Sequence, residues 1–447
     1  MVAAVALPIV IQNAITNFVN LLDNMMVGQI GTLPMSAVSI SNQLLQIINL
    51  AIIGSVNAVG IFGAQFYGKR DMDGVRDCMR IKLLVTALFL VVGISLFLGF
   101  GNRLVGLYMD PAANTRDDIA ATLAYSHTYL RIMLIGLVPF GLSMAVGSVS
   151  REAGRTVLNM FSSIAGVLTN FVLNYILIFG HFGAPKLGVA GAAIATVIAR
   201  FTELAVISFG LWRNRHEFTF LKDVFRIAKL PGDLLKRVII KGTPLTMNEI
   251  LWSVGLAAIS QCYSTRGLDA IASINITMTI TNVFSILCMA FGMSISILVG
   301  QRLGAGKIEE AKDMDRKLLT TSVLVNVFCG TLLFLSAPLF PSFYNVSPHV
   351  KELASVLLRI AAVMLPLQAI YYGCYFTLRA GGKTVITFLF DSAYTVCVSL
   401  VIAFILTHFT SLPITVIYFC VLLADLPKAI IGLYLLHKGI WANNLVS

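Results

Sequence analysis

The chain has 447 residues, of which 57% are apolar and only 12% are charged, and its mean hydropathy is +0.87. A soluble domain carries roughly 25% charged residues, so the composition excludes one and indicates an integral membrane protein. The net charge of +11 does not indicate nucleic-acid binding, because the basic residues occupy short connections and form no basic face with interleaved aromatic residues.

Apolar segments of the roughly 20 residues needed to cross a bilayer recur twelve times along the chain. They lie at 3–30, 33–67, 83–109, 119–148, 157–180, 188–212, 243–265, 268–301, 318–343, 353–378, 384–408 and 414–436. The first lacks the basic region and cleavage site of a signal peptide, so we expect it to belong to the structure. The sequence predicts an all-α membrane protein with twelve transmembrane helices.

Basic residues predict the orientation. Most of the 32 lysines and arginines fall in alternate connections and in the tail. These stretches are 69–82, 151–155, 213–241, 302–317, 379–383 and the residues after 436. The positive-inside rule makes them cytoplasmic, together with both termini, in a multi-pass protein of the cell membrane. The seven cysteines are scattered without CxxC spacing and predict neither a disulfide nor a metal site.

The first apolar segment carries one charge, Asp23, and one early proline, Pro8. An ionised carboxylate in a membrane span costs roughly 2.5 to 3.5 kcal/mol on insertion scales, so it usually has a function. Pro8 removes a backbone hydrogen bond and favours bending. We interpret Asp23 as the ion switch of a transporter and Pro8 as a hinge.

An internal repeat organises the chain. Four residues of the first half recur 236 positions later, and after an eight-residue length change the motif SREAGRT recurs as LRAGGKT at a spacing of 228. The first four pairs are Pro8 and Pro244, Gly31 and Gly267, Gln65 and Gln301, and Gly68 and Gly304. The repeat predicts two lobes of six helices in the same orientation, 1–212 and 242–447, with substrate bound between them.

The linker, residues 213–241, is basic and is interrupted at Pro231 and Gly232. It also carries apolar residues at intervals, and we expect it to lie on the cytoplasmic membrane surface. These residues are Phe218, Leu221, Val224, Phe225, Ala228 and Leu230.

The motifs, in their order, resemble those of the multidrug and toxic compound extrusion (MATE) transporters. They are LP followed by LLDNMMVGQIG, the GxQxxG-like segments after the second and eighth spans, LNYILIFG, GVAGAAIATVIAR, RAGGKT, and DLPKAIIG followed by Trp441 and NNL. The resemblance implies two six-helix lobes in a V around a central cavity. It also implies efflux driven by inward flow of H⁺ or Na⁺.

Five acidic residues lie inside the predicted spans: Asp23, Glu203, Glu249, Asp391 and Asp425. Glu203 follows Arg200 by three residues and Asp425 precedes Lys428 by three, so both predict structural ion pairs. Asp23 and Glu249 have no basic residue within a helical turn, which favours ion coupling. Asp391 is either a further ion-coupling residue or is balanced by Arg359 or Arg379.

Oxygen-bearing side chains near Asp23 favour a cation site. Asn170 and Asn174 are four residues apart, on one helix face, and Thr196 lies on the next span. With Asp23 they resemble the ion site of DinF-like MATE members and predict either Na⁺ or H⁺ coupling. Asn174 stands where that branch often has a second aspartate, which weakens the case for Na⁺. Hydrogen bonding between helices is the alternative role.

Glu249 resembles the seventh-helix glutamate of NorM-like members, and Pro244 is the second predicted hinge. Other protein classes are less consistent with the residues. GGKT at 381–384 lacks the first glycine of a phosphate loop, and neither HExxH nor a nucleophile elbow occurs, so we predict no enzyme. A channel is not excluded by motif, and a flippase for a lipid-linked precursor is the nearest alternative. The prediction is a monomeric antiporter that exports organic cations or drugs without a cofactor.

Overall fold

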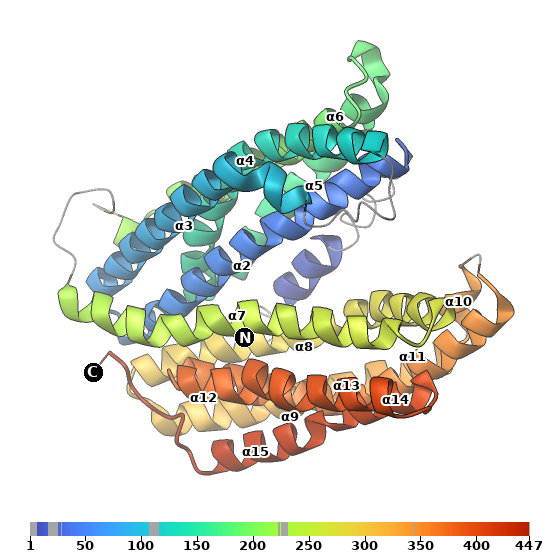
Figure 1. Ribbon diagram of the computed structural model, residues 1–447. Helices are drawn as coiled ribbons and strands as arrows, with labels where there is room; N and C mark the ends of the chain where they lie inside the picture. The colour runs from blue at the N-terminus through green and yellow to red at the C-terminus, as the bar shows by residue number, and fades with distance from the viewer. Residues whose placement is uncertain are drawn as a thin grey trace. The chain divides into compact units, whose positions relative to one another are not determined.

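The computed structural model describes residues 7–16, 26–27, 29–106, 116–221, 224, 231–344 and 346–446, and these are overwhelmingly helical (Figure 1). A first helix spans Leu7–Thr16. The later helices are α2 (Thr32–Lys69), α3 (Met72–Gly106), α4 (Arg116–Glu152), α5 (Thr156–Phe179), α6 (Val189–Arg213), α7 (Gly232–Ser264), α8 (Leu268–Gly304), α9 (Ile308–Ser336), α10 (Leu339–Ser342), α11 (Pro348–Ala380), α12 (Thr384–Phe388), η3 (Leu389–Ala393), η4 (Thr395–Ser399), α13 (Leu400–Phe409), α14 (Ile414–Leu423) and α15 (Asp425–His437).

The eleven predicted spans after the first each correspond to a helix or to helical segments joined end to end. Ten helices in the described part of the chain are long and apolar enough to cross a membrane, with α12 to α13 counted as one and α14 to α15 as another. α7 corresponds to one further predicted span, and within the first, 3–30, the structure describes the helix Leu7–Thr16. The fold class, an all-α membrane protein, is therefore confirmed.

Three helices begin about ten residues before the predicted spans, at Met72, Gly232 and Ile308. Their first turns are polar and carry acidic residues. Negative charge is favourable near a helix N-terminus, where the backbone N–H groups are unpaired. Apolar patterning predicts the membrane-spanning length of such a helix and misses its polar start.

The helices form two compact units. One comprises Ile11–Gly63 and Met72–Leu235; the other comprises Ala64–Asp71 and Lys236–Ser447, with the chain up to Val10. Each unit has its own core of interdigitated apolar side chains. The last turns of α2 therefore pack with the helices of the second sequence half.

The ends of α2 and α8 contact each other through two glycines. A Cβ atom on Gly68 would lie 1.8 Å from the backbone oxygen of Gln301, and one on Gly304 would lie 1.8 Å from that of Gln65. Only glycine permits such an approach of two backbones. These four residues are two of the repeat pairs, so each half supplies a glycine that packs on the glutamine of the other.

The chain after α15 packs over the end of α2. The amide nitrogen of Gln65 donates to the backbone oxygens of Ala380 at 3.0 Å and Asn443 at 3.3 Å, and its amide oxygen accepts from the Leu445 N–H at 2.7 Å. Lys69 donates to the backbone oxygen of Val446 at 2.5 Å. The polar groups of buried Gln65 are thus satisfied by the tail and by the end of α11.

The linker packs against α3. Arg76 and Arg80 of α3 donate to the backbone oxygens of Phe220 at 3.2 Å and Val224 at 3.0 Å. Phe218 and Val224 are only 2% and 4% exposed. Their apolar side chains are thus buried within the protein, and the location of the linker on the membrane surface stays a prediction. The apolar positions at 225, 228 and 230 lie outside the described residues.

Candidate functional site

Three uncharged polar side chains meet between α5 and α6. The Asn170 amide nitrogen donates to the Thr196 hydroxyl at 3.2 Å, and the Asn174 amide nitrogen donates to the Asn170 amide oxygen at 3.2 Å. The predicted shared face of Asn170 and Asn174 is confirmed, and Thr196 joins it. Asp23 lies outside the described residues, so its predicted place in this cluster stays a prediction.

Small residues let α5 and α6 approach closely. A Cβ atom on Gly191 would lie 2.5 Å from the backbone oxygen of Leu177, and one on Gly166 would lie 2.3 Å from the side chain of Glu203. The buried face of α5 is mostly polar or small: Thr156, Asn159, Ser162, Gly166, Asn170, Asn174 and Ile178. This inward polar stripe is typical of packed membrane helices, whose lipid-facing sides are apolar.

A second polar link joins the first helix to α5. The Gln12 side-chain nitrogen donates to the Ser163 hydroxyl at 2.8 Å. Neither residue was predicted, although a glutamine one turn after Pro8 in an apolar segment was a usable signal. The link ties the helix that carries Pro8 to the helix that carries Asn170.

The predicted structural pairs have different outcomes. Arg200 and Glu203 form the predicted ion pair at 2.9 Å. For Asp425 the prediction is wrong, because Lys428 pairs with Asp391 at 2.8 Å. Arg359 and Arg379 were the predicted partners of Asp391. That prediction is also wrong, because Asp391 pairs with Lys428. A spacing of three residues allows contact on a helix face, but here the closer partner comes from another helix.

Asn248 of α7 is the centre of a buried network in the second half. Its side-chain nitrogen donates to Asp391 Oδ2 at 3.0 Å and to the Tyr375 hydroxyl at 3.2 Å. Its side-chain oxygen accepts from the Ser392 hydroxyl at 2.7 Å and from the Ser392 backbone N–H at 3.3 Å. One side chain thus connects α7 with α11 and with η3.

Glu249, the next residue on α7, pairs with Arg379 of α11. The distance from Arg379 Nη1 to Glu249 Oε1 is 3.6 Å, and the same nitrogen donates to the Tyr375 hydroxyl at 3.3 Å. The side chain of Glu249 is 22% exposed, whereas that of Arg379 is 7% exposed. Glu249 is therefore held loosely at the edge of the network.

Lys428 lies at the opposite end of the network, under aromatic rings. Its ammonium is 4.6 Å from the ring centroid of Tyr371 and 5.7 Å from that of Phe390, within cation–π range. Its partner Asp391 sits in η3, a π-helical stretch. Such stretches are rare and often occur at functional sites.

Within the described part of the chain, five charged side chains belong to this network, and their charges do not balance. Glu249 and Asp391 are joined by Asp425, which is close enough to interact electrostatically with Lys428 and Asp391. These three carboxylates face two cations, Arg379 and Lys428. When all five are ionised, the network carries one excess negative charge.

The repeat predicted from the sequence also appears in a comparison with known families. The profile of the MatE family matches residues 8–176 and 244–407, so it matches twice, beginning at Pro8 and again at Pro244. Together the matched residues cover well over half of the chain. The chain belongs to the MatE family. Members of this family are transporters and not enzymes. The predicted family and the prediction that the protein is not an enzyme are therefore confirmed.

Individual MatE relatives match over most of their length. The probable multidrug resistance protein NorM of Thermotoga maritima is 26% identical over 394 residues, 86% of this chain and 81% of that protein. The probable multidrug resistance protein YoeA of Bacillus subtilis is 25% identical over 413 residues, 91% of this chain and 86% of that protein. A solved structure of an outward-facing multidrug resistance MATE family transporter has a TM-score of 0.87 at 18% identity and covers 98% of this chain and 94% of that one.

Two further buried polar contacts in this MatE chain were not predicted. Lys82 of α3 and Glu152 of α4 form an ion pair with side chains 0% and 9% exposed. Asp315 of α9 is 4% exposed and accepts from the Thr377 hydroxyl at 2.5 Å. All but Thr377 fall in stretches that the sequence assigned to connections. The glycines at 60 and 63, one turn apart beside Glu152, were the available signal.

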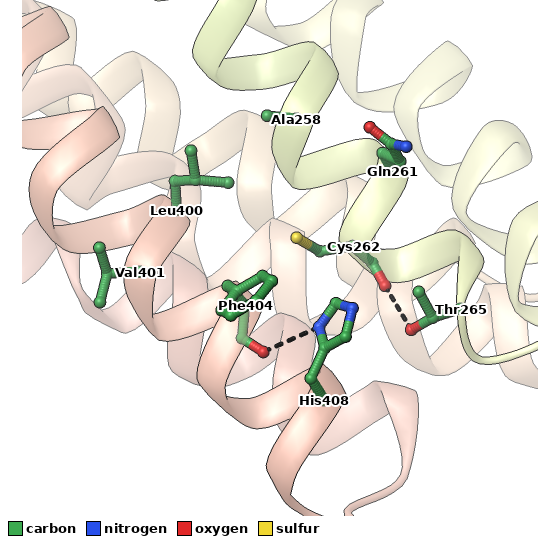
Figure 2. Close-up of a pocket in the computed structure, with 8 residues that line it drawn as sticks. All are labelled: Ala258, Gln261, Cys262, Thr265, Leu400, Val401, Phe404 and His408. Atoms are coloured by element: carbon green, nitrogen blue, oxygen red, sulfur yellow. Dashed lines mark hydrogen bonds between the residues drawn. The ribbon is translucent and has the colours of Figure 1, made fainter.

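A groove of about 480 Å³ lies between α7 and α13, as Figure 2 shows. Its lining residues are Ala258, Gln261, Cys262, Thr265, Leu400, Val401, Phe404 and His408. None of these is a predicted site residue. Gln261 is twelve residues beyond Glu249 on α7, a rise of roughly 18 Å along a helix, so the groove is separate from the charged network.

Proposed function

We propose that this MatE transporter exports organic cations or drugs in exchange for inward H⁺ or Na⁺ by alternating access. The observation that carries the proposal is the charge imbalance in the network around Asn248, where, among the residues that the structure describes, three carboxylates accompany two cations. An uncompensated charge in a membrane span is unfavourable. One monovalent cation, bound in one conformation and released in the other, would balance it.

Glu249 is the ion carrier of the second half in this proposal. Two carboxylates of the network form ion pairs, Glu249 and Asp391. Glu249 is the more weakly paired, at 3.6 Å compared with 2.8 Å for Asp391, and it is partly exposed. Asp23 is its counterpart in the first half. The oxygens of Asn170, Asn174 and Thr196 are of the kind that Na⁺ prefers, and they would complete a site there.

Pro8 and Pro244 are the hinges. Pro244 lies inside α7, five residues before Glu249. A proline inside a helix removes one backbone hydrogen bond and favours a bend. An ion that binds Glu249 differently in two conformations shifts their equilibrium only by that difference in binding free energy. Because the hinge lies near Glu249, bending of the helix would give this carboxylate different surroundings in the two conformations.

Substrate class and topology are part of the proposal. The names of the two relatives, both probable multidrug resistance proteins, support drugs as substrates. The basic connections support cytoplasmic termini in a cell-membrane protein. A monomeric state is also part of the proposal.

The test is efflux of a fluorescent cationic dye from vesicles that contain the purified protein. We expect dye efflux when either a pH gradient or a Na⁺ gradient is imposed, and the effective gradient identifies the coupling ion. A rate of dye movement that neither gradient changes contradicts coupled antiport. Transfer of a lipid-linked sugar between leaflets, without dye efflux, favours a flippase.

A further inference from the structure

A helix-to-helix link of the second half repeats a link of the first. At the repeat spacings of 236 and 228, Gln12 corresponds to Asn248 and Ser163 corresponds to Asp391. The Gln12 amide donates to Ser163 at 2.8 Å, and the Asn248 amide donates to Asp391 at 3.0 Å. In each half, an amide on the first span bridges to the same position of the fifth.

A basic residue at a third repeated position completes the comparison. Arg200 corresponds to Lys428 at the spacing of 228. Arg200 pairs with Glu203 on its own helix at 2.9 Å, whereas Lys428 pairs with Asp391 at 2.8 Å. The first half therefore makes the amide link through neutral Ser163. The link itself requires no carboxylate and no ion.

Both oxygens of Asp391 are occupied. Oδ1 accepts from the Lys428 ammonium at 2.8 Å, and Oδ2 accepts from Asn248 at 3.0 Å. Lys428 is 3% exposed, so it is a fixed counter-charge and not a mobile surface cation. Asp391 is therefore held more closely by its cation, at 2.8 Å, than Glu249 is by Arg379, at 3.6 Å.

Asn248 connects the Asp391–Lys428 pair to α7, where Glu249 is the next residue. An amide side chain has two N–H donors and two acceptor positions. The donors bind Asp391 and Tyr375, and the oxygen accepts twice from Ser392. The Ser392 hydroxyl also lies within hydrogen-bond distance of the Asn248 backbone oxygen, at 2.6 Å. These contacts hold α7 against α11 and η3 at the residue next to Glu249.

We infer that Asp391 and Lys428 are positioning residues that act through Asn248 to hold Glu249 opposite Arg379. The inference rests on the proposed function, in which Glu249 carries the ion. The charged or titratable groups that face Glu249 are Arg379 and Tyr375 of α11 and Asp391 of η3. The pair keeps Asp391 from acting on Glu249 as an unbalanced negative charge.

The experiment compares Lys428→Met, Asp391→Asn and the double variant in dye-efflux vesicles, with Glu249→Gln as reference. Each single change leaves one buried charge unpaired, so we expect efflux to fall at least about tenfold. The double variant removes both charges. We expect it to recover to within about threefold of wild type, with an unchanged dependence of rate on pH.

The outcomes separate the inference from the proposed function. A double variant as inactive as Asp391→Asn alone overturns the inference, because Asp391 then carries the ion itself. Single variants with wild-type rates also overturn it. If wild-type vesicles show no gradient-driven efflux, the proposed function fails instead.

Asn248→Ala provides a second test that leaves the ion pair in place. The matched control is Gln261→Ala, a change of an exposed side chain on the same helix. We expect Asn248→Ala to lower the maximal rate about tenfold, the scale set by unpaired buried hydrogen-bonding groups, and to move the pH of half-maximal rate. Dye affinity without a gradient should stay unchanged. A lower rate with the wild-type pH profile would show a role in folding alone and overturn the inference.

Discussion

The third and fourth spans of each half are joined by a buried polar contact, and the two contacts differ in chemistry. In the first half, Lys82 of α3 pairs with Glu152 of α4. In the second, Thr377 of α11 donates to Asp315 of α9 at 2.5 Å. At the repeat spacings, Asp315 and Thr377 lie one turn before the equivalents of Lys82 and Glu152.

The ion pair of the first half has no counterpart at the equivalent positions, which are Leu318 and Ala380, and two glycines make room for it in the first half. A Cβ atom on Gly60 would lie 2.8 Å from one carboxylate oxygen of Glu152, and one on Gly63 would lie 2.1 Å from the other. At the spacing of 236, the second half has Ser296 and Val299 in place of these glycines. The repeat preserves helix order and glycine crossings, whereas the position and sign of buried charges change between halves.

The largest expected effect tests whether both halves carry an ion. Asp23→Asn and Glu249→Gln each freeze one carboxylate in a neutral form, so we expect loss of gradient-driven efflux. Dye binding should persist in Asp23→Asn, because that change removes the switch and not the fold. The measurement is efflux under a pH gradient and under a Na⁺ gradient, with dye binding measured separately.

The same experiment can show which half carries the coupling ion. Wild-type rates and ion dependence in Asp23→Asn would leave the second half as the sole carrier. Wild-type behaviour in Glu249→Gln would leave the first. Loss in both variants supports a carrier in each half.

The next effect concerns stability. Lys82→Met leaves Glu152 buried without its partner, and we expect it to lower the free energy of unfolding by about 3 to 5 kcal/mol. The double variant Lys82→Met with Glu152→Gln should recover most of that loss. Asp315→Asn keeps a hydrogen-bonding group opposite Thr377, so we expect a change of about 1 kcal/mol or less. Denaturant titration in detergent micelles measures all three.

Equal losses in Lys82→Met and Asp315→Asn would contradict the comparison, since the two contacts would then be energetically alike. A double variant no more stable than Lys82→Met would show that the lysine acts through packing and not through its charge.

A smaller effect is expected at the reciprocal glycine crossing. Gly68→Ala and Gly304→Ala each place a Cβ atom 1.8 Å from a backbone oxygen. The backbones must separate, and overpacking of this kind costs about 1 to 3 kcal/mol. The control is Gly99→Ala, whose Cβ would meet nothing within 4 Å. If the crossing is symmetric, the two variants lose similar amounts of stability in the same titration.

The sequence predicted what depends on regular patterns. Apolar length predicted the spans, the repeat predicted the equivalence of Gly68 and Gly304, and helical spacing predicted the contacts of Asn170 with Asn174 and of Arg200 with Glu203. It failed where a distant partner decides the contact. Lys428 is three residues from Asp425, but the nearer carboxylate belongs to Asp391, 37 positions away in the chain. Tertiary packing, and not spacing, selects between two such partners.

Polar helix ends were the other source of error. Lys82, Glu152 and Asp315 lie in charged stretches that resemble exposed connections, and their burial depends on neighbouring helices. For Glu152 the space comes from Gly60 and Gly63 of α2, nearly ninety residues earlier in the chain. A local pattern contains no information on that distance.

The smallest effect is expected in the linker, where the two halves join. Lys236 and Arg237 are both exposed at the start of α7, and Arg237 also donates to the backbone oxygen of Leu445 at 3.1 Å. Exposed substitutions usually change stability by no more than about 0.5 kcal/mol, so Lys236→Gln should transport at the wild-type rate. Arg237→Gln should behave the same way, because glutamine can still donate to that carbonyl. Efflux rates of the two variants, corrected for the amount of protein in the vesicles, measure the difference. Abolished transport in Arg237→Gln alone would mean that its contact with the tail takes part in the conformational cycle.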